Sequence, residues 1–252
     1  MFGVLLASAL VGLLGILPYV LTLFERLPPS IADSLPPLWV LLPIQLAQSL
    51  VLVGLATALG LWLGPKVGLG APEIYDLVRG DREVRSRLRT LLLPSVLLGV
   101  LVGVTIVLLD VWVFGPRLAA SGSSLSTLQP PAWQGLLASA YGGIVEELLL
   151  RLGLMTLLVW VGVRLTRSEV ARPVVVWFAI VTAALIFGAG HLPTTATLLP
   201  LTPLVIARAL LLNGVGGIVF GWLYWKRGLL AAMLAHFSAD IVLHVVAPAL
   251  AR

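Results

Sequence analysis

Residues 133–163 read WQGLLASAYGGIVEELLLRLGLMTLLVWVGV, and they decide the fold. The stretch is longer than the about 20 mostly apolar residues that a membrane-spanning helix needs. It nevertheless carries Glu146, Glu147 and Arg151 in its middle. Each charged side chain within a span costs about 2.5–3.5 kcal/mol on insertion scales. The stretch therefore predicts a spanning helix whose charges serve either packing or chemistry.

The composition of the whole chain supports a membrane protein. Of 252 residues, 60% are hydrophobic and only 11% are charged, with a mean hydropathy of +1.08. Soluble domains carry about 25% charged residues, so this chain lacks the polar residues to cover a water-exposed surface. It contains no cysteine, which excludes disulfides, thiolate metal sites and cysteine nucleophiles.

The apolar runs predict an all-α, polytopic transmembrane bundle of about seven helices, within a range of six to eight. The first run lacks the basic start of a signal peptide, so we read it as a retained helix. The predicted spans are residues 2–24, 38–63, 91–114, 133–163, 173–191, 203–225 and 228–249.

Basic residues set the predicted orientation. The net charge of +5 and the pI near 10.2 could indicate nucleic acid, but Arg-rich cytoplasmic loops explain them more simply, so we expect membrane lipids and no nucleic acid as partners. With the N-terminus inside the cell membrane and the C-terminus outside, most basic residues are cytoplasmic: Lys66, Arg79, Arg82, Arg85, Arg87, Arg89, Arg164, Arg167, Arg172, Lys226 and Arg227.

We divide the chain into an N-terminal three-helix membrane region, residues 1–132, and a catalytic core, residues 133–252. The first region contains a basic cytoplasmic loop at 64–90. Within it, the 72–92 stretch could form an amphipathic helix at the membrane surface or an ordinary solvated loop. Residues 116–132 are rich in Gly, Ser and Pro and predict an external connector.

Helical spacing separates the charges of the fourth span. Glu147 and Arg151 are four residues apart, so they share a face and can pair. Glu146 points about 100° away and has no local partner. A carboxylate in this situation can accept and return a proton. The alternative is a helix-packing role for all three residues.

Two other spans carry histidine. His236, Asp240 and His244 follow one another at steps of four residues in the seventh span and form one polar stripe. His and carboxylate at this spacing can bind a metal, orient each other or polarise a carbonyl. His244 is nearest the outer end, so we rank it below the other two. The fifth span ends at His191, one turn after Phe187.

Together these residues resemble a known family. Glu146-Glu147-x-x-x-Arg151, Phe187-x-x-x-His191 and His236-x-x-x-Asp240 look like the three motifs of the CPBP intramembrane proteases. That group includes the type II CAAX prenyl endopeptidases and the Abi or bacteriocin-immunity proteins. The resemblance covers about residues 133–249. The first three spans carry no motif.

The resemblance implies an intramembrane endopeptidase that cleaves a membrane-anchored protein or peptide, with or without a prenyl group. Glu146 would activate water, and His191 and His236 would bind a metal or stabilise an oxyanion. Glu147, Arg151 and Asp240 complete the implied catalytic set, and Phe187 would contact substrate. A divalent metal, zinc first, could be held by Glu146, His191, His236 and Asp240, and a metal-free glutamate mechanism is the other form. We favour the metal form by a small margin.

Two alternatives to an enzyme stay open at this stage. One is a non-catalytic relative, a membrane scaffold or immunity protein that keeps the polar core for packing. The other is a small proton-coupled transporter, although the sequence shows no internal repeat of the kind transporters have.

The depths of the motifs pose a structural problem. At 1.5 Å per residue, Glu146 lies about 25 Å from the cytoplasmic end of its span at Val163, whereas His236 lies only about 14 Å from Arg227. For one site to form, the fourth and fifth spans must protrude into the cytoplasm, or the 226–227 turn must lie deeper than a normal loop.

Overall fold

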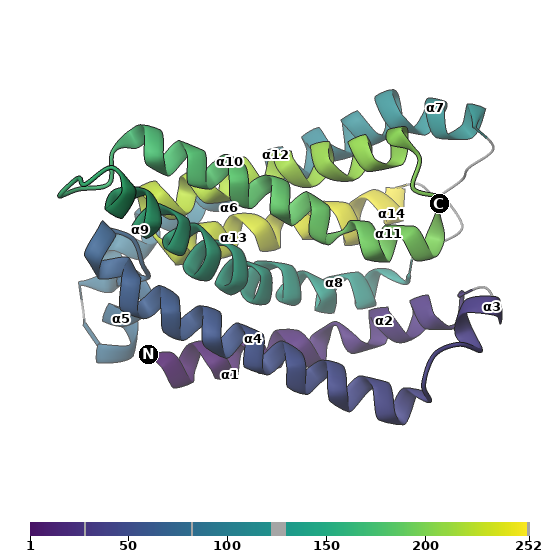
Figure 1. The fold of residues 1–252 in the computed structure, drawn as a ribbon, viewed down its shortest axis with the longest axis horizontal. Helices are drawn as coiled ribbons and strands as arrows, with labels where there is room; N and C mark the ends of the chain where they lie inside the picture. Colours follow the sequence, from purple (N-terminus) through teal and green to yellow (C-terminus); the bar gives the residue numbers. More distant parts are fainter. Residues whose placement is uncertain (28, 82, 122–129, 251–252) are drawn as a thin grey trace.

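The computed structural model describes residues 1–27, 29–81, 83–121 and 130–250, and every regular element in these ranges is helical. Figure 1 shows the long helices running side by side along the longest axis of the molecule, with the two chain ends at opposite ends of the bundle. The described chain is therefore an all-helical bundle, as predicted, and the placement of the N-terminus inside and the C-terminus outside stays a prediction.

Seven helical segments of the described chain are long and apolar enough to cross a membrane, which confirms the predicted number. They are Phe2–Phe24 (α1, Phe2–Gly15, and α2, Leu17–Phe24), Leu38–Lys66 (within α4, Leu38–Val67), Ser86–Ala120 (α6, Val84–Leu109; η1, Asp110–Phe114; α7, Gly115–Ala120), Ala132–Leu165 (α8, Ala132–Ala140; η3, Tyr141–Glu146; η4, Leu148–Met155; α9, Thr156–Leu165), Pro173–Leu198 (α10, Pro173–Gly190; α11, Leu192–Leu198), Pro203–Arg227 (α12) and Leu229–Leu250 (α13, Leu229–Ile241; η5, Val242–Val246; α14, Ala247–Leu250).

Proline and glycine set several helix ends. α10 and α12 begin at Pro173 and Pro203, where a proline costs nothing because the first turn has no intrahelical partner for its N–H. α12 ends at Gly228, whose φ of +80° is a conformation that favours glycine. The sharp turn at Gly228 lets α13 start at once and run back through the bundle.

The basic 72–92 stretch is neither one long helix nor a plain loop. A short helix, α5, covers Pro72–Arg79 and ends at Gly80, whose φ is +74°. The third span then begins at Val84, earlier than predicted. At the other end of this span, helix α7 extends into the predicted external connector, whose residues 122–129 lie outside the described residues.

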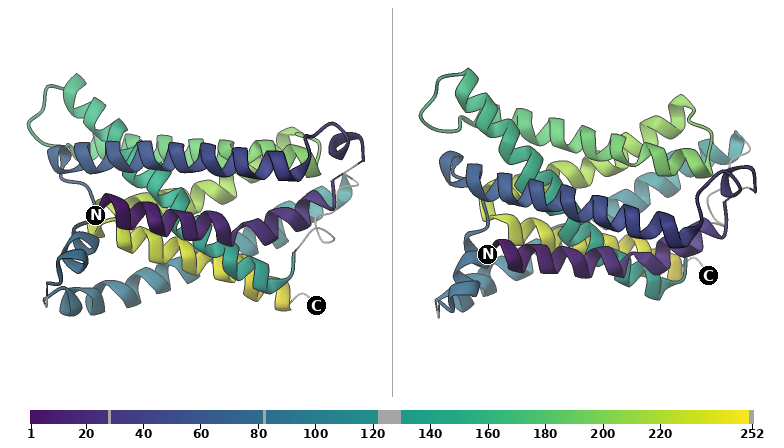
Figure 2. Two further views of the ribbon diagram at one scale, coloured as in Figure 1. Left: turned by 90° about the horizontal axis from the view of Figure 1, so that it is seen from below. Right: turned by 60° about the horizontal axis from the view of Figure 1, so that its bottom comes forward.

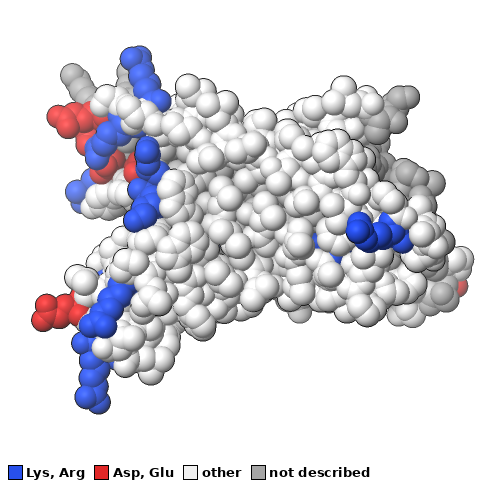
Figure 3. Space-filling view, turned by 90° about the horizontal axis from the view of Figure 1, so that it is seen from above, with Lys and Arg blue, Asp and Glu red and all other residues white. Residues whose placement is uncertain are grey.

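Charged side chains gather at one end of the bundle, as the orientation requires. Figure 3 shows most of the Lys, Arg, Asp and Glu side chains at the end that carries α5 and the connector between α9 and α10, with few at the other end. The positive-inside rule predicts that this end faces the cytoplasm. We call it the basic end.

Close helix packing surrounds the fourth and seventh spans. α6 packs along α13, with a Cβ at Gly99 or Gly103 falling against the backbone of Ala235 or Ala239. α12 packs along α10 in the same way, with Gly217 against Ala184. Small residues at these crossings let helix backbones approach. They hold the helices that carry the polar residues in one fixed arrangement.

Candidate active site

The fourth span is not a regular α-helix where its charges lie. Residues Tyr141–Glu146 and Leu148–Met155 form the π-helical segments η3 and η4, on either side of Glu147. π-helical turns are rare and occur often at functional sites. The sequence did not predict this geometry, which changes the direction in which each following side chain points.

Glu147 is the buried centre of a network between three helices. Its Oε1 accepts a hydrogen bond of 2.7 Å from Nδ1 of His236 and forms an ion pair of 3.1 Å with Nη1 of Arg151. Arg151 also donates through Nη2 to the carbonyl of Gly217 on α12. Glu147 is 0% exposed and Arg151 1%. The pairing predicted from the four-residue spacing is therefore confirmed, and His236 joins it.

His236 lies at the middle of the cluster, on α13. While Nδ1 faces Glu147, Nε2 lies 3.6 Å from Oε2 of Glu146 and 3.7 Å from Oδ1 of Asp240. The ring stacks on Phe220 at 4.6 Å between centroids and meets the edge of Phe187 at 5.7 Å. Buried rings and one short hydrogen bond therefore hold the imidazole, with Nε2 aimed between two carboxylates.

Glu146 and Asp240 differ from Glu147 in their access to the outside. The Glu146 side chain is 19% exposed and that of Asp240 13%, whereas that of Glu147 is wholly buried. Their distances to Nε2, 3.6 Å and 3.7 Å, are longer than a direct hydrogen bond. Glu146 is therefore the carboxylate best placed to meet a water or a substrate.

Gly142 is a site residue that the sequence reasoning missed. A Cβ at this position would overlap Oδ2 of Asp240 and would stand 3.1 Å from Nε2 of His236. Only a glycine leaves room for α13 to bring both side chains beside the fourth span. The signal was available, because Gly142-Gly143 stands one turn before Glu146.

His191 lies next to this cluster, separated from it by an aromatic ring. It follows the last residue of α10, and its Nδ1 lies 2.9 Å from the carbonyl oxygen of Phe187. The Phe187 ring meets His191 edge-on at 4.8 Å and His236 at 5.7 Å. Phe187 is thus mostly buried between the two histidines. Its predicted contact with substrate stays a prediction.

The described residues do not form a preorganised metal site. Among the residues that the structure describes, no group of three or more His, Asp or Glu side chains is arranged to hold one. The donors themselves, imidazole and carboxylate, are of the type that zinc takes. The zinc ion implied by the resemblance therefore stays a prediction, and we derive the chemistry from protein groups alone.

The remaining polar residues of the spans lie apart from the site. Arg208 pairs with Asp110 through two contacts of 2.6 Å. His244 meets the edge of the Tyr19 ring at 5.9 Å and packs against Gly135, so it belongs to helix packing, as its lower rank anticipated.

The depth problem is solved mainly by protrusion. Figure 2 shows the connector between α9 and α10 reaching farther out at the basic end than the start of α13. The turn at Gly228 is in addition covered, because the N–H of Leu229 donates to the carbonyl of Gly70 at 3.1 Å. The protruding connector and the covered turn together place His236 at the same depth in the bundle as Glu147.

Comparison with known proteins agrees with the motifs. The family model described as Type II CAAX prenyl endopeptidase Rce1-like matches residues 128–242, which contain every residue of the cluster and His191. Comparisons with curated proteins and with solved structures gave no match. The described chain has seven helical segments able to cross a membrane, and its residues 128–242 are similar to the Rce1-like type II CAAX prenyl endopeptidases.

Proposed function

We propose that the chain is an intramembrane endopeptidase that hydrolyses a peptide bond in a membrane-anchored substrate. One observation carries the proposal: the partly exposed Glu146 lies 3.6 Å from Nε2 of His236, whose other nitrogen is fixed by the buried Glu147. The similarity to this family supports the reaction class, since the Rce1-like family generally contains CAAX endopeptidases.

In the proposed reaction, Glu146 accepts a proton from a water molecule as the oxygen attacks the substrate carbonyl. His236, when it carries both protons, donates from Nε2 to the oxyanion that forms. Glu146 then returns its proton to the leaving amine. Glu147 and Arg151 act as positioning residues because they hold Nδ1 of His236 and face away from solvent. Asp240 helps to orient the water beside Nε2.

The substrate peptide is proposed to be membrane-anchored because the cluster is formed by spanning helices. A prenyl group on that peptide is a separate question, which a matched pair of prenylated and unprenylated peptides answers. We propose that the active protein lies in the cell membrane.

Peptide cleavage by the purified full chain in liposomes tests the proposal. Glu146→Gln keeps the shape of the side chain but removes the base, so cleavage should fall about 10²–10⁴-fold, the usual contribution of a general base. Cleavage by His236→Ala should fall by at least the same factor. Asp110→Asn, which alters a polar residue of the membrane region far from the cluster, serves as the control.

Two results would redirect the proposal. Equal cleavage by wild type and Glu146→Gln would remove Glu146 from the mechanism. Absence of cleavage by wild type on all membrane-anchored peptides would favour the alternative, a non-catalytic scaffold or immunity-type protein. Metal analysis of the same preparation, with and without chelator, decides whether a zinc ion takes part.

A further inference from the structure

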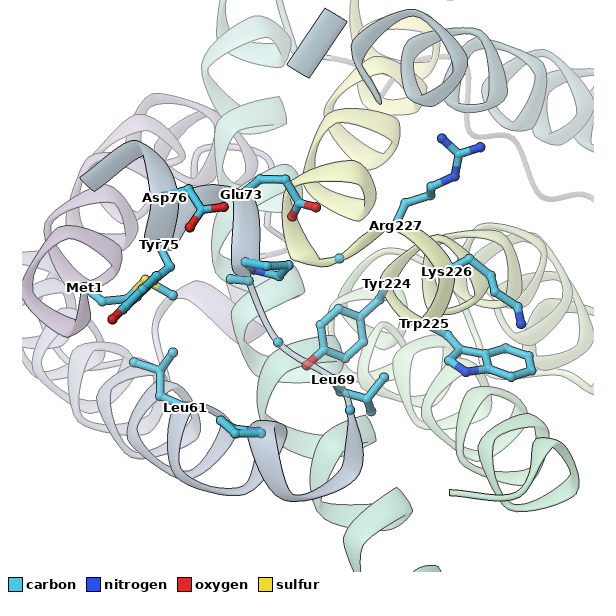
Figure 4. Close-up of a pocket in the computed structure, with 17 residues that line it drawn as sticks. Met1, Leu61, Leu69, Glu73, Tyr75, Asp76, Tyr224, Trp225, Lys226 and Arg227 are labelled. Atoms are coloured by element: carbon cyan, nitrogen blue, oxygen red, sulfur yellow. The ribbon is translucent and has the colours of Figure 1, made fainter. Parts of the chain in front are cut away.

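A cavity opens at the basic end of the bundle, next to the site but separate from it. Its volume is ≈ 800 Å³, within the range of about 300–1,000 Å³ that small-ligand sites occupy. Figure 4 shows its walls, which come from the start of α1, the end of α4, α5 with its preceding connector, and the end of α12. None of the clustered acids and histidines lines it.

The cavity and the site share helix α12. Tyr224 lines the cavity, and its hydroxyl lies 2.7 Å from that of Thr156. Phe220, one turn away on the same helix, stacks on His236. Four residues of helix correspond to about 6 Å, a length that about two residues of extended peptide span. A substrate whose scissile bond lies at the site could therefore reach the cavity with a nearby side chain.

Glu73 is the residue of the cavity wall that would favour a positively charged ligand. Its Oε2 atom is buried and has no hydrogen-bond partner among the described residues. It lies so close to Gly228 that a Cβ there would stand 2.6 Å from it. A buried oxygen without a donor is unfavourable, and more so when it is charged. Burial also raises the pKa of Glu73, against the opposing effects of a backbone N–H and of the Arg87 cation.

The other charged residues of the cavity already have neighbours. Asp76 pairs with Arg87 at 2.9 Å. The Lys226 ammonium lies over the Trp225 ring at 3.5 Å from its centre. Figure 4 shows the charged ends of Lys226 and Arg227 pointing away from Glu73. Glu73 is thus the acceptor in this cavity that a ligand can satisfy.

We propose that this cavity binds a lysine or arginine side chain of the substrate, with Glu73 as its counter-ion. The inference rests on the proposed function. Membrane-anchored chains carry Lys and Arg just past the cytoplasmic end of the anchor, which is the level of this cavity. The apolar stem of such a side chain fits against Met1, Leu61 and Leu69, and its charged end reaches the carboxylate.

A binding experiment on the full chain tests this directly. The protein carries Glu146→Gln to prevent cleavage and is held in dodecyl maltoside micelles. Two dansyl-labelled, single-span peptides differ at one position, two residues past the cytoplasmic end, which is lysine or norleucine. Energy transfer from protein tryptophan to the label gives Kd. We expect about tenfold tighter binding of the lysine peptide, a ratio that Glu73→Gln reduces to one.

Asp76→Asn is the matched control, because Asp76 lines the same cavity but is already paired with Arg87. It should keep the preference for lysine. Equal binding of both peptides to the Glu73-containing protein would overturn the inference, as would a preference that survives Glu73→Gln. If phosphatidylethanolamine, compared with phosphatidylcholine, abolishes the preference, the occupant is a lipid amine and the substrate assignment fails.

Cleavage by protein with Glu146 intact separates this inference from the proposed function. If both peptides are cleaved but bind equally, the cavity assignment fails alone. If the lysine peptide binds more tightly through Glu73 but neither peptide is cleaved, the proposed function fails alone. A melting temperature for Glu73→Gln within a few degrees of wild type shows that the variant is folded.

Discussion

Two Arg–carboxylate ion pairs in the described spanning helices differ in geometry and in the neighbours of their carboxylates. Asp110 and Arg208 form two contacts of 2.6 Å between the third and sixth spans, with side chains 32% and 21% exposed. Glu147 and Arg151 form one contact of 3.1 Å within the fourth span, and both are almost fully buried. By contact geometry alone, the first pair is the better one.

The difference teaches that the quality of an ion pair does not indicate its role. The Glu147 carboxylate is shared with His236, so its geometry is a compromise between two partners. The Asp110 carboxylate serves Arg208, and the bidentate arrangement that Arg favours results. The Glu147–Arg151 pair holds His236 in place, whereas the Asp110–Arg208 pair joins the third and sixth spans.

Breaking the inner pair should have the largest effect. Arg151→Met removes the cation and leaves Glu147 charged, buried and supported only by His236. Loss of one partner of a buried pair costs about 3–5 kcal/mol, which an SDS unfolding titration should detect. Peptide cleavage should fall as well, because His236 would be drawn towards the unpaired carboxylate. A change below about 1 kcal/mol would mean that the pair is not held as the structure describes.

Replacing both partners should separate stability from activity. In Glu147→Leu combined with Arg151→Met, apolar residues replace both partners and neither charge stays buried without the other, so most of the lost stability should return. His236 still lacks its Nδ1 acceptor. Loss of such a positioning partner reduces activity about 10–100-fold where it has been measured at metal sites. Recovery of cleavage together with stability would show that Glu147 serves packing alone.

Breaking the outer pair should have a smaller effect, confined to stability. Asp110→Asn leaves Arg208 partly exposed near the outer end, where it can reach the interface. We expect a loss of about 1–2 kcal/mol in the same SDS titration, below the cost of a charge at the membrane centre. Cleavage should equal that of wild type. A large loss of cleavage would place the outer pair in the catalytic machinery after all.

The sequence predicted what depends on local spacing. Apolar runs of about 20 residues predicted seven spans because only helices of that length satisfy their backbone in lipid. The Glu147–Arg151 pair followed from a separation of four residues. The motif pattern brought Glu146, His236 and Asp240 into one hypothesis, and the structure places Nε2 of His236 3.6 Å from Oε2 of Glu146 and 3.7 Å from Oδ1 of Asp240.

The sequence could not predict what depends on the rotation of one helix against another. It did not show that His236 turns Nδ1 towards Glu147 and Nε2 towards Glu146, nor that the Phe187 ring separates His191 from His236. The π-helical turns around Glu147 shift these rotations. The pair of Arg208 with Asp110 likewise depends on the packing of the sixth span against the third.

Glu73 extends the comparison to a carboxylate that lacks a cation, and its variant should show the smallest effect. Burial is the main cause that raises the pKa of Glu73 above its ordinary value of 4.5, while a backbone N–H and Arg87 oppose the rise and Asp76 adds to it. The folded state therefore binds this proton more strongly than the unfolded state does. As pH rises through the window between the unfolded and folded pKa, the carboxylate becomes charged at a cost to the fold.

Glu73→Gln removes that cost, so the variant should melt about 2 °C above wild type at pH 7. Below pH 4.5 Glu73 is protonated in both states, and the difference should disappear. Melting curves at pH 4 and pH 7 check this, with Asp76→Asn, which loses a pair with Arg87, expected to show no gain. An equal gain in melting temperature at both pH values would mean that the changed shape of the side chain, and not the lost charge, stabilises the variant. A saturating amount of the lysine peptide should cancel this gain at pH 7, because in wild type it supplies Glu73 with a cation. Glu147 and Asp110 already have such a cation in Arg151 and Arg208.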